Sequence, residues 1–172
     1  MRTRLGCFVL VCLLAASAHA QGEKVAPGLQ ADVKKMLAAT IGGDYETLVT
    51  MTHPKAIEAM GGIDKAKQVL KLTLDSLKAS GFTTTLEEVG TPALANSTTT
   101  SYAVIPYTVV LEGAGKKITA KTAVVGISDN GGKSWKFLNI NEQGEEGMRK
   151  LVPDLPRELK FPKQEQKVEE SK

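Results

Sequence analysis

Residues 63–89 read IDKAKQVLKLTLDSLKASGFTTTLEEV, and this stretch decides the fold because its hydrophobic period changes at Gly81. Before the glycine, apolar residues recur at spacings of three and four, which predicts a helix over Ile63 to Ser80 with one buried face. Gly81 is typical of the end of such a helix. After it, Phe82 to Val89 is threonine-rich and favours a β-strand. The predicted apolar stripe of the helix consists of Ile63, Ala66, Val69, Leu70, Leu74 and Leu77.

The residues that precede this stretch are also predicted to be helical. Leu29 to Ile41 shows the same apolar spacing and is followed by the helix-ending pair Gly42-Gly43. Asp44 is a suitable N-cap for a second, short helix. Pro54 suits the first turn of a third helix, where its missing N–H would have no partner in any case.

The residues that follow the stretch are predicted to be strands. The patterns indicate strands over Thr98 to Glu112, Lys116 to Ser128 and Ser134 to Ile140. Pro106 lies inside the first of these, so the sheet should have an edge or a bulge there. Helices followed by strands predict an α+β domain, with the N-terminal helices packed on a curved antiparallel sheet of about four strands.

The first twenty residues have the pattern of a secretory signal peptide. Arg2 and Arg4 precede an apolar run, and Ala18-His19-Ala20 ends it with small residues at the positions that a signal peptidase reads. We therefore expect cleavage after Ala20 and a secreted or periplasmic protein. The expected organisation is a signal peptide over 1–20, a leader over 21–28, one α+β domain over 29–152, and a polar, disordered tail over 153–172.

Cleavage would change which functions the chain can support. Both cysteines and one of the two histidines lie in the predicted signal peptide, and the 22 Lys and Arg residues would fall to 20 against 19 Asp and Glu. A nearly neutral protein is not expected to bind nucleic acid by electrostatic attraction. With one histidine and no cysteine, we also expect no metal site and no cofactor. No span of the mature chain is long and apolar enough to cross a membrane.

Several short stretches resemble the nuclear-transport-factor-2-like superfamily, which includes ketosteroid isomerase and the polyketide-cyclase-like proteins. They are Gly43-Asp44-Tyr45-Glu46-Thr47-Leu48, the run from Thr52-His53-Pro54 to Met60-Gly61-Gly62, and Gly131-Gly132-Lys133-Ser134-Trp135-Lys136-Phe137. The chain is most similar to uncharacterised secreted bacterial members. The resemblance implies a cone-shaped, cystatin-like architecture with a conical pocket between helices and sheet, in which family enzymes hold a carboxylate base or a His–Asp pair. No position here maps onto that base.

His53, Tyr45 and Tyr107 are the weak candidates for catalysis. A histidine titrates near neutrality and could act as an acid or base, and tyrosine hydroxyls could donate hydrogen bonds into a pocket. The alternative is structural: a helix-turn histidine and two core aromatic residues.

Four apolar side chains are candidates for lining a ligand site, with plain core packing as the alternative. They are Met51, Met60, Trp135 and Phe137. The segment Ser128 to Trp135 also resembles the Asp-box of sialidase-type propellers, but Asn130 replaces the aspartate and the motif occurs once. We interpret it as a β-hairpin with Trp135 packed on its turn.

The leading hypothesis is therefore an exported, non-catalytic domain that binds a small apolar ligand or a protein partner in or around a conical pocket. One alternative is a cofactor-independent isomerase, dehydratase or cyclase that uses His53. A second alternative is a homo-oligomeric structural module, such as a homodimer.

Overall fold

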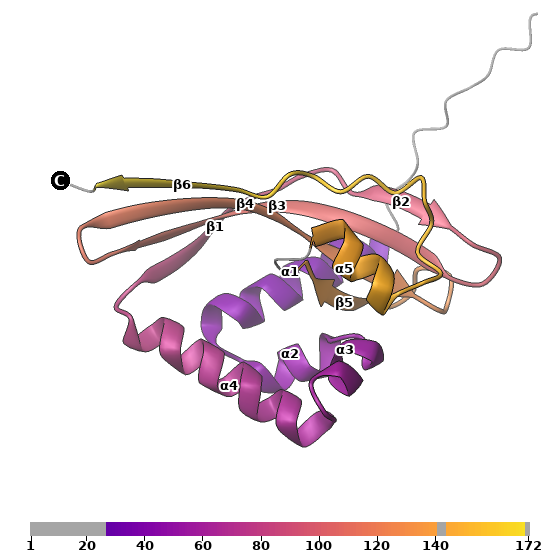
Figure 1. Ribbon diagram of the computed structural model, residues 1–172, viewed down its shortest axis with the longest axis horizontal. Helices are drawn as coiled ribbons and strands as arrows, with labels where there is room; N and C mark the ends of the chain where they lie inside the picture. Colours follow the sequence, from indigo (N-terminus) through magenta and orange to yellow (C-terminus); the bar gives the residue numbers. More distant parts are fainter. Residues whose placement is uncertain (1–26, 141–143, 171–172) are drawn as a thin grey trace, which may run out of the picture.

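The computed structural model describes residues 27–140 and 144–170. The helices and strands follow one another in the order expected for an α+β domain, with four helices first (Figure 1). The predicted signal peptide and most of the leader lie outside the described residues. The elements are α1 (Pro27–Gly42), α2 (Tyr45–Met51), α3 (Pro54–Ala59), α4 (Ile63–Ala79), β1 (Thr83–Val89), β2 (Ala93–Asn96), β3 (Ser101–Gly113), β4 (Lys116–Ser128), β5 (Lys136–Asn139), α5 (Gly144–Leu151) and β6 (Glu165–Glu170).

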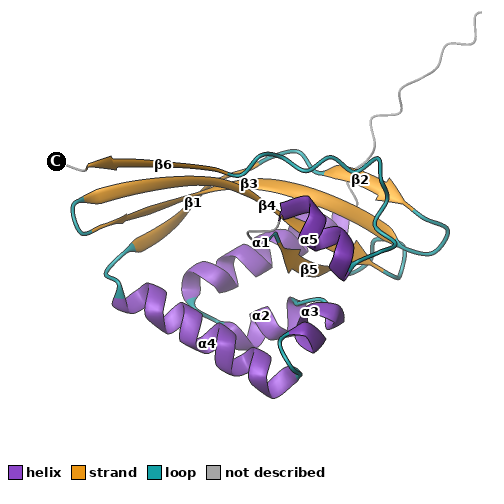
Figure 2. Cartoon of the chain, in the orientation of Figure 1, coloured by secondary structure: helices purple, strands orange, loops and turns teal. Residues whose placement is uncertain are grey.

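The predicted α+β fold class is confirmed, and the sheet is larger than the four strands expected. Six antiparallel strands form one sheet, with the order β1-β3-β4-β5, while β2 also pairs with β3 and β6 also pairs with β4. The two additional strands are short or polar, so neither carries the apolar alternation by which a strand is found. The long strands β3 and β4 form a bowed central ribbon (Figure 2).

Pro106 lies where one edge of β3 changes partners, as its place in the strand predicts. Tyr107 pairs with the end of β1 at Val89, and Val104 pairs with the start of β2 at Ala93. The Pro106 carbonyl accepts from the N–H of Gly90, 2.8 Å away, in the connection between those strands. In an extended strand, the nitrogen and the carbonyl of one residue point to the same edge. The N–H that Pro106 lacks would therefore point to the edge where hydrogen bonding passes from β1 to β2 and is already interrupted.

One face of the sheet packs on the N-terminal helices. Its core joins the buried faces of α1, α2 and α4 to Ala103, Ile105, Val124, Trp135 and Phe137. Gly126 makes room for the two aromatic rings, because a Cβ atom there would lie 3.1 Å from Trp135 and 3.3 Å from Phe137. Figure 1 shows α1–α4 gathered on one side of the sheet. We call this side of the sheet the helix face.

The apolar stripe predicted for α4 is correct except at two of its residues, which are exposed. Ala66 and Leu74 are buried and Leu70 packs against the core, as expected. Ile63 and Val69, however, are 55% and 46% exposed. Ile63 is the first residue of the helix, and Val69 lies about 100° around the helix from Leu70 and about 140° from Leu74, so both side chains stay largely exposed.

The opposite face, which we call the second face, is covered by α5 and by residues beyond 152 that were expected to be a disordered tail. Met148 of α5 and Val152, Leu155 and Leu159 are all buried against the sheet. Residues 165–170 then form β6. The structure therefore corrects the expected tail over 153–172, and the folded unit extends beyond residue 152. The apolar residues of this segment are separated by prolines and charges without helical or strand period, and that spacing hid their burial.

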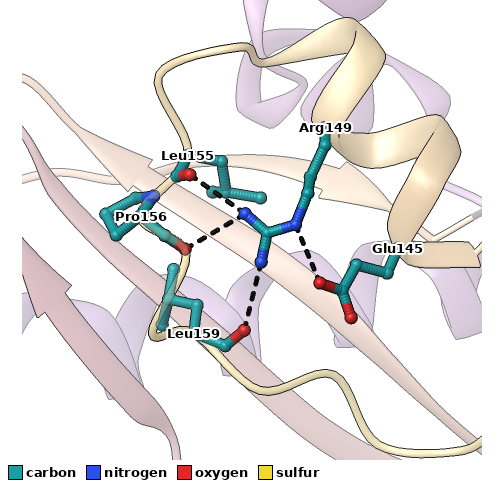
Figure 3. A network of polar contacts seen from close by, with 5 residues as sticks. All are labelled: Glu145, Arg149, Leu155, Pro156 and Leu159. Atoms are coloured by element: carbon teal, nitrogen blue, oxygen red, sulfur yellow. Dashed lines mark hydrogen bonds and ion pairs between the residues drawn. The ribbon is translucent and has the colours of Figure 1, made fainter.

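Arg149 of α5 fastens this segment (Figure 3). Its guanidinium donates to the carbonyl oxygens of Leu155, Pro156 and Leu159 at 3.0, 3.2 and 3.4 Å. The same group pairs with Glu145 at 2.8 Å and lies over the ring of Phe161. Arginine suits this role because its planar group presents five donors in a fixed arrangement. We call this set of contacts the Arg149 clamp.

Within residues 27–140 and 144–170, none of the helices combines the length and the apolar character that crossing a membrane would require.

Candidate functional site

A mostly apolar cavity of about 410 Å³ lies among the helices and the short strand β5. Five helices contribute to its wall, so residues far apart in sequence meet there. We call it the helix cavity. Its lining residues are Met36, Thr40, Leu48, Met51, Thr52, Ala56, Ala59, Met60, Leu70, Thr73, Leu74, Phe137, Leu138, Asn139 and Leu151.

Helical spacing explains why these residues share one space. On α4, Leu70, Thr73 and Leu74 fall at i, i+3 and i+4, and on α1, Met36 and Thr40 are four residues apart. Positions three and four apart lie on the same side of a helix. The stripe that packs each helix on the core therefore continues into the wall of the cavity.

The cavity wall carries little polarity. Its polar side chains are Asn139, which is exposed, and three threonines. Each threonine hydroxyl donates to a carbonyl of the preceding helical turn: Thr40 to Met36 at 3.0 Å, Thr52 to Leu48 at 2.7 Å, and Thr73 to Val69 at 2.9 Å. The lining residues include no ionisable side chain.

Three of the four residues predicted to line a ligand site come together here. Met51, Met60 and Phe137 all contribute to the helix cavity. Trp135 does not. Its indole N–H donates to the Gly132 carbonyl at 3.1 Å, and its backbone N–H donates to Asp32 of α1 at 2.9 Å.

Trp135 belongs to the hairpin that the sequence predicted. Asn130 organises its turn, since its side-chain oxygen accepts from the Ser128 hydroxyl and from the backbone N–H groups of Lys133 and Ser134 at 2.9, 3.2 and 3.0 Å. Gly131 and Gly132 have φ of 70° and 81°, which suits glycine. The Asp-box-like stretch thus connects β4 to β5 and holds α1 against the sheet.

His53 lies between α2 and α3, outside the lining of the helix cavity. Its Nδ1 accepts from the backbone N–H of Lys55 at 3.2 Å, so the imidazole caps α3 in its neutral form. Its backbone N–H donates to the Phe137 carbonyl at 2.9 Å and ties this turn to β5. Partial burial lowers the pKa of His53, and the Asp129 carboxylate opposes this in part.

The two candidate tyrosines lie at separate places. Tyr45 is the first residue of α2, and Tyr107 is in the middle of β3; both are partly buried against the helix-face core. Burial raises the pKa of Tyr107. Tyr107 lines a different, open depression of about 380 Å³, which also contains Glu88 and Lys121. His53, Tyr45 and Tyr107 therefore do not share one cavity.

Most of the cavity wall was not singled out from the sequence. Met36, Leu70, Leu74 and Leu151 fall at helical spacings that core packing explains equally well. The pattern shows that a side chain faces inward, but it does not show whether a neighbour fills the space in front of it. Among the described residues, no group of three or more His, Cys, Asp or Glu is placed to hold a metal ion.

Comparison with known proteins places few constraints on the chain. No protein-family profile matches it, and no curated protein does. A solved structure from Streptomyces avermitilis, provisionally described as a dehydratase of the NTF2-like family, is similar to it with a TM-score of 0.41 and 13% identity. The similarity covers 65% of this chain and 89% of that chain. The α+β assignment rests on the elements described above, and a similarity of this size assigns neither family nor activity.

Proposed function

We propose that this protein is an exported, non-catalytic domain that binds a small apolar molecule in the helix cavity. The observation that carries the proposal is the cavity itself, a partly open space of about 410 Å³ lined mainly by Leu, Met, Ala and Phe side chains. Small-molecule sites in proteins are commonly concave spaces of several hundred Å³ with mostly apolar walls. An engineered apolar cavity of about 150 Å³ accommodates benzene, so this one suits a molecule of roughly 16 non-hydrogen atoms.

The position of His53 favours binding over catalysis. A general base must reach the proton that it removes, and His53 does not line the helix cavity. Its Nδ1 is engaged in capping α3. The isomerase, dehydratase or cyclase alternative would need a substrate outside this cavity. The resemblance to the nuclear-transport-factor-2-like superfamily remains an expectation from the sequence.

Titration with a fluorescent apolar probe tests the binding proposal. N-phenyl-1-naphthylamine is a neutral aromatic amine of suitable size that becomes bright in apolar surroundings. We expect saturable binding of one probe per chain. Absence of saturable binding, or binding only to unfolded protein, would overturn the proposal.

Two matched variants of α4 locate the binding. Leu70 lines the cavity, whereas Leu72, two residues along the same helix, is 67% exposed. Leu70→Trp should fill the cavity and abolish saturable binding, and Leu72→Trp should leave it unchanged. Far-ultraviolet circular dichroism of both variants checks that they fold. Equal effects of the two changes would place the probe elsewhere.

Export is part of the proposal and has its own test. Expression of the full chain in a bacterium, followed by fractionation and N-terminal sequencing, should yield an extracytoplasmic protein that begins at Gln21. A cytoplasmic protein that retains residues 1–20 would refute the export claim and leave the binding claim standing.

A further inference from the structure

The polar groups of the helix cavity indicate which class of apolar molecule it takes. Thr40 lies in α1, Thr73 lies in α4, and Thr52 directly follows α2. A threonine hydroxyl has one hydrogen to donate and lone pairs that accept. Which of these remains free determines the ligand group that each threonine can satisfy.

The hydroxyl hydrogens are already used. All three threonines donate to backbone carbonyls of their own helices, at 2.7–3.0 Å. What they still offer is their oxygen lone pairs, so they are hydrogen-bond acceptors toward the cavity. The lining side chain with N–H donors is that of Asn139, which is solvent-exposed, as is Thr73. The less exposed part of the wall, which contains Thr40 and Thr52, therefore accepts hydrogen bonds better than it donates them.

The same wall disfavours a charged ligand. Among the described residues, no cationic or anionic side chain lines the cavity, so a ligand carboxylate or ammonium would leave water without an ionic partner there. Burial of a charge without a partner is strongly unfavourable. A ligand carbonyl or ether oxygen is also disfavoured, because it needs a hydrogen-bond donor and the threonine hydroxyl hydrogens are already used.

The methionines of the cavity affect which ligand shapes fit more than which ligand polar groups are preferred. Met36, Met51 and Met60 contribute thioethers from three helices. Methionine side chains are flexible and polarizable, and they adapt to ligands of different outline. Selectivity in this site should therefore depend on the polar group of the ligand more than on its hydrocarbon shape.

We propose that the helix cavity selects uncharged, mainly hydrocarbon molecules that carry a hydroxyl group, such as long-chain alcohols or alkylphenols. The ligand hydroxyl donates to a threonine oxygen while its hydrocarbon part lies against the leucines and methionines. This inference rests on the proposed binding function and adds the chemical class of the ligand to it.

Calorimetric titration of the unmodified protein with matched compounds tests the proposal. The series is decan-1-ol, its methyl ether, decan-2-one and decanoate. A net hydrogen bond between neutral groups corresponds to roughly a fivefold difference in affinity. We expect the alcohol to bind about fivefold more tightly than the ether or the ketone, and decanoate to bind at least tenfold more weakly than the alcohol.

The outcomes distinguish failure of the hydroxyl selectivity from failure of the proposed binding function. Equal binding of alcohol, ether and ketone would support an apolar site and overturn the hydroxyl selectivity. Tighter binding of the ketone would overturn it in favour of Asn139 as the polar contact. Tightest binding by decanoate would overturn the exclusion of charge. No binding by any member of the series would count against the proposed function itself.

Threonine-to-valine variants identify the accepting oxygen. In Thr40→Val, Thr52→Val and Thr73→Val, the shape is kept and the acceptor is lost. The alcohol-to-ether ratio should fall to about one in at least one of the three. Thr50→Val is the control, because Thr50 also donates to a carbonyl of its own helix, at 2.7 Å, but lies outside the cavity. An unchanged ratio in all three variants would overturn the assignment, and the titration of the unmodified chain does not depend on whether any variant folds.

Discussion

The two faces of the sheet are both buried near the β4–β5 end, but they are covered in different ways. On the helix face, α1 and α2 pack on the strands, α4 packs on α2 and α3, and the helix cavity lies among these helices, β5 and the end of α5. On the second face, α5 and residues 152–161 lie on Tyr102, Val104, Ala123 and Val125, and the Arg149 clamp holds them there.

This difference separates two tasks within one small domain. Regular helices present ridges that cannot fill every space between them, so a helical cover leaves room for a cavity where helices diverge. An irregular segment can follow the sheet surface closely, but its carbonyl groups need partners. Arg149 supplies those partners. The tight cover therefore supports the sheet, while the open cover on the other face is available for a ligand.

Removal of the clamp should have the largest effect. Arg149→Met removes a donor from three carbonyl groups, of which that of Pro156 keeps the Leu159 N–H, and it removes the contact with Phe161. We expect the free energy of unfolding to fall by about 4 kcal/mol, measured by urea denaturation. The control is Lys150→Met, since Lys150 makes an exposed pair with Glu146 and should change stability by less than about 0.5 kcal/mol. Similar losses in both variants would contradict the special role of the clamp.

A pair of leucine truncations compares the two covers directly. Leu159 is 2% exposed on the second face, whereas Leu70 is partly exposed at the helix cavity. Leu159→Ala should destabilise the protein by about 3 kcal/mol, and Leu70→Ala by about 1 kcal/mol, because only the first creates a new void in a filled region. Urea denaturation monitored by Trp135 fluorescence measures both. A larger loss for Leu70→Ala would mean that the cavity is closed and packed in solution.

Enlarged side chains should show the reverse preference. Ala123 is 1% exposed on the second face, so Ala123→Leu is expected to cost about 2 kcal/mol through overpacking. Ala59 is exposed and lines the helix cavity, and Ala59→Leu should change stability by less than about 0.5 kcal/mol. Thermal unfolding of the two variants provides the measurement. If Ala59→Leu is the more destabilising change, there is no spare volume at that wall.

The smallest expected effect is a pH dependence of stability that arises from His53, which lies between α2 and α3. Because burial lowers the pKa of His53 in the folded protein, its neutral form contributes stability above pH 6.5, and this contribution is lost as pH falls through the lower folded value. Protonation also prevents Nδ1 from accepting the Lys55 N–H. We expect the unmodified protein to lose up to about 1 kcal/mol between pH 7.5 and 5.5.

His53→Asn is the matched variant, since asparagine can cap α3 without titrating. It should be about as stable as the unmodified protein at pH 7.5 and should lack the imidazole-linked loss at pH 5.5. Urea denaturation at the two pH values measures the difference. The same pH dependence in both proteins would assign it to other groups.

Much of the scaffold could be predicted from local pattern. The strand Lys116–Ser128 has the predicted bounds, the period change at Gly81 marks the junction of helices and sheet, and Trp135 packs on its hairpin as expected. These features depend on residues close in sequence. Met51, Met60 and Phe137 were predicted as candidates for lining a ligand site, and they do meet at one cavity. The cavity itself depends on how whole helices diverge, and the periodicity of the sequence does not encode that.

The strand β6 was not predicted because the evidence for it lies in how its charges match those of β4, a stretch that is distant in sequence. In β6, Val168 is the only strongly apolar residue, so the segment reads as solvated charge. The register, however, places Glu170 opposite Lys116, Glu169 opposite Lys117 and Glu165 opposite Lys121. Opposite charges across paired strands are favourable, and this complementarity was present in the sequence. It becomes visible only when the two stretches are aligned antiparallel.

The order of the elements along the chain also affects when the second face can be covered. Residues 144–170 are synthesised after β1 to β5, so the second face has no cover until they emerge. At a translation rate of about 20 residues per second, that delay is on the order of a second. During this interval Val104, Val125 and Leu138 lack the apolar side chains that bury them in the folded domain. Folding of the domain is therefore complete only after residues 144–170 have been made.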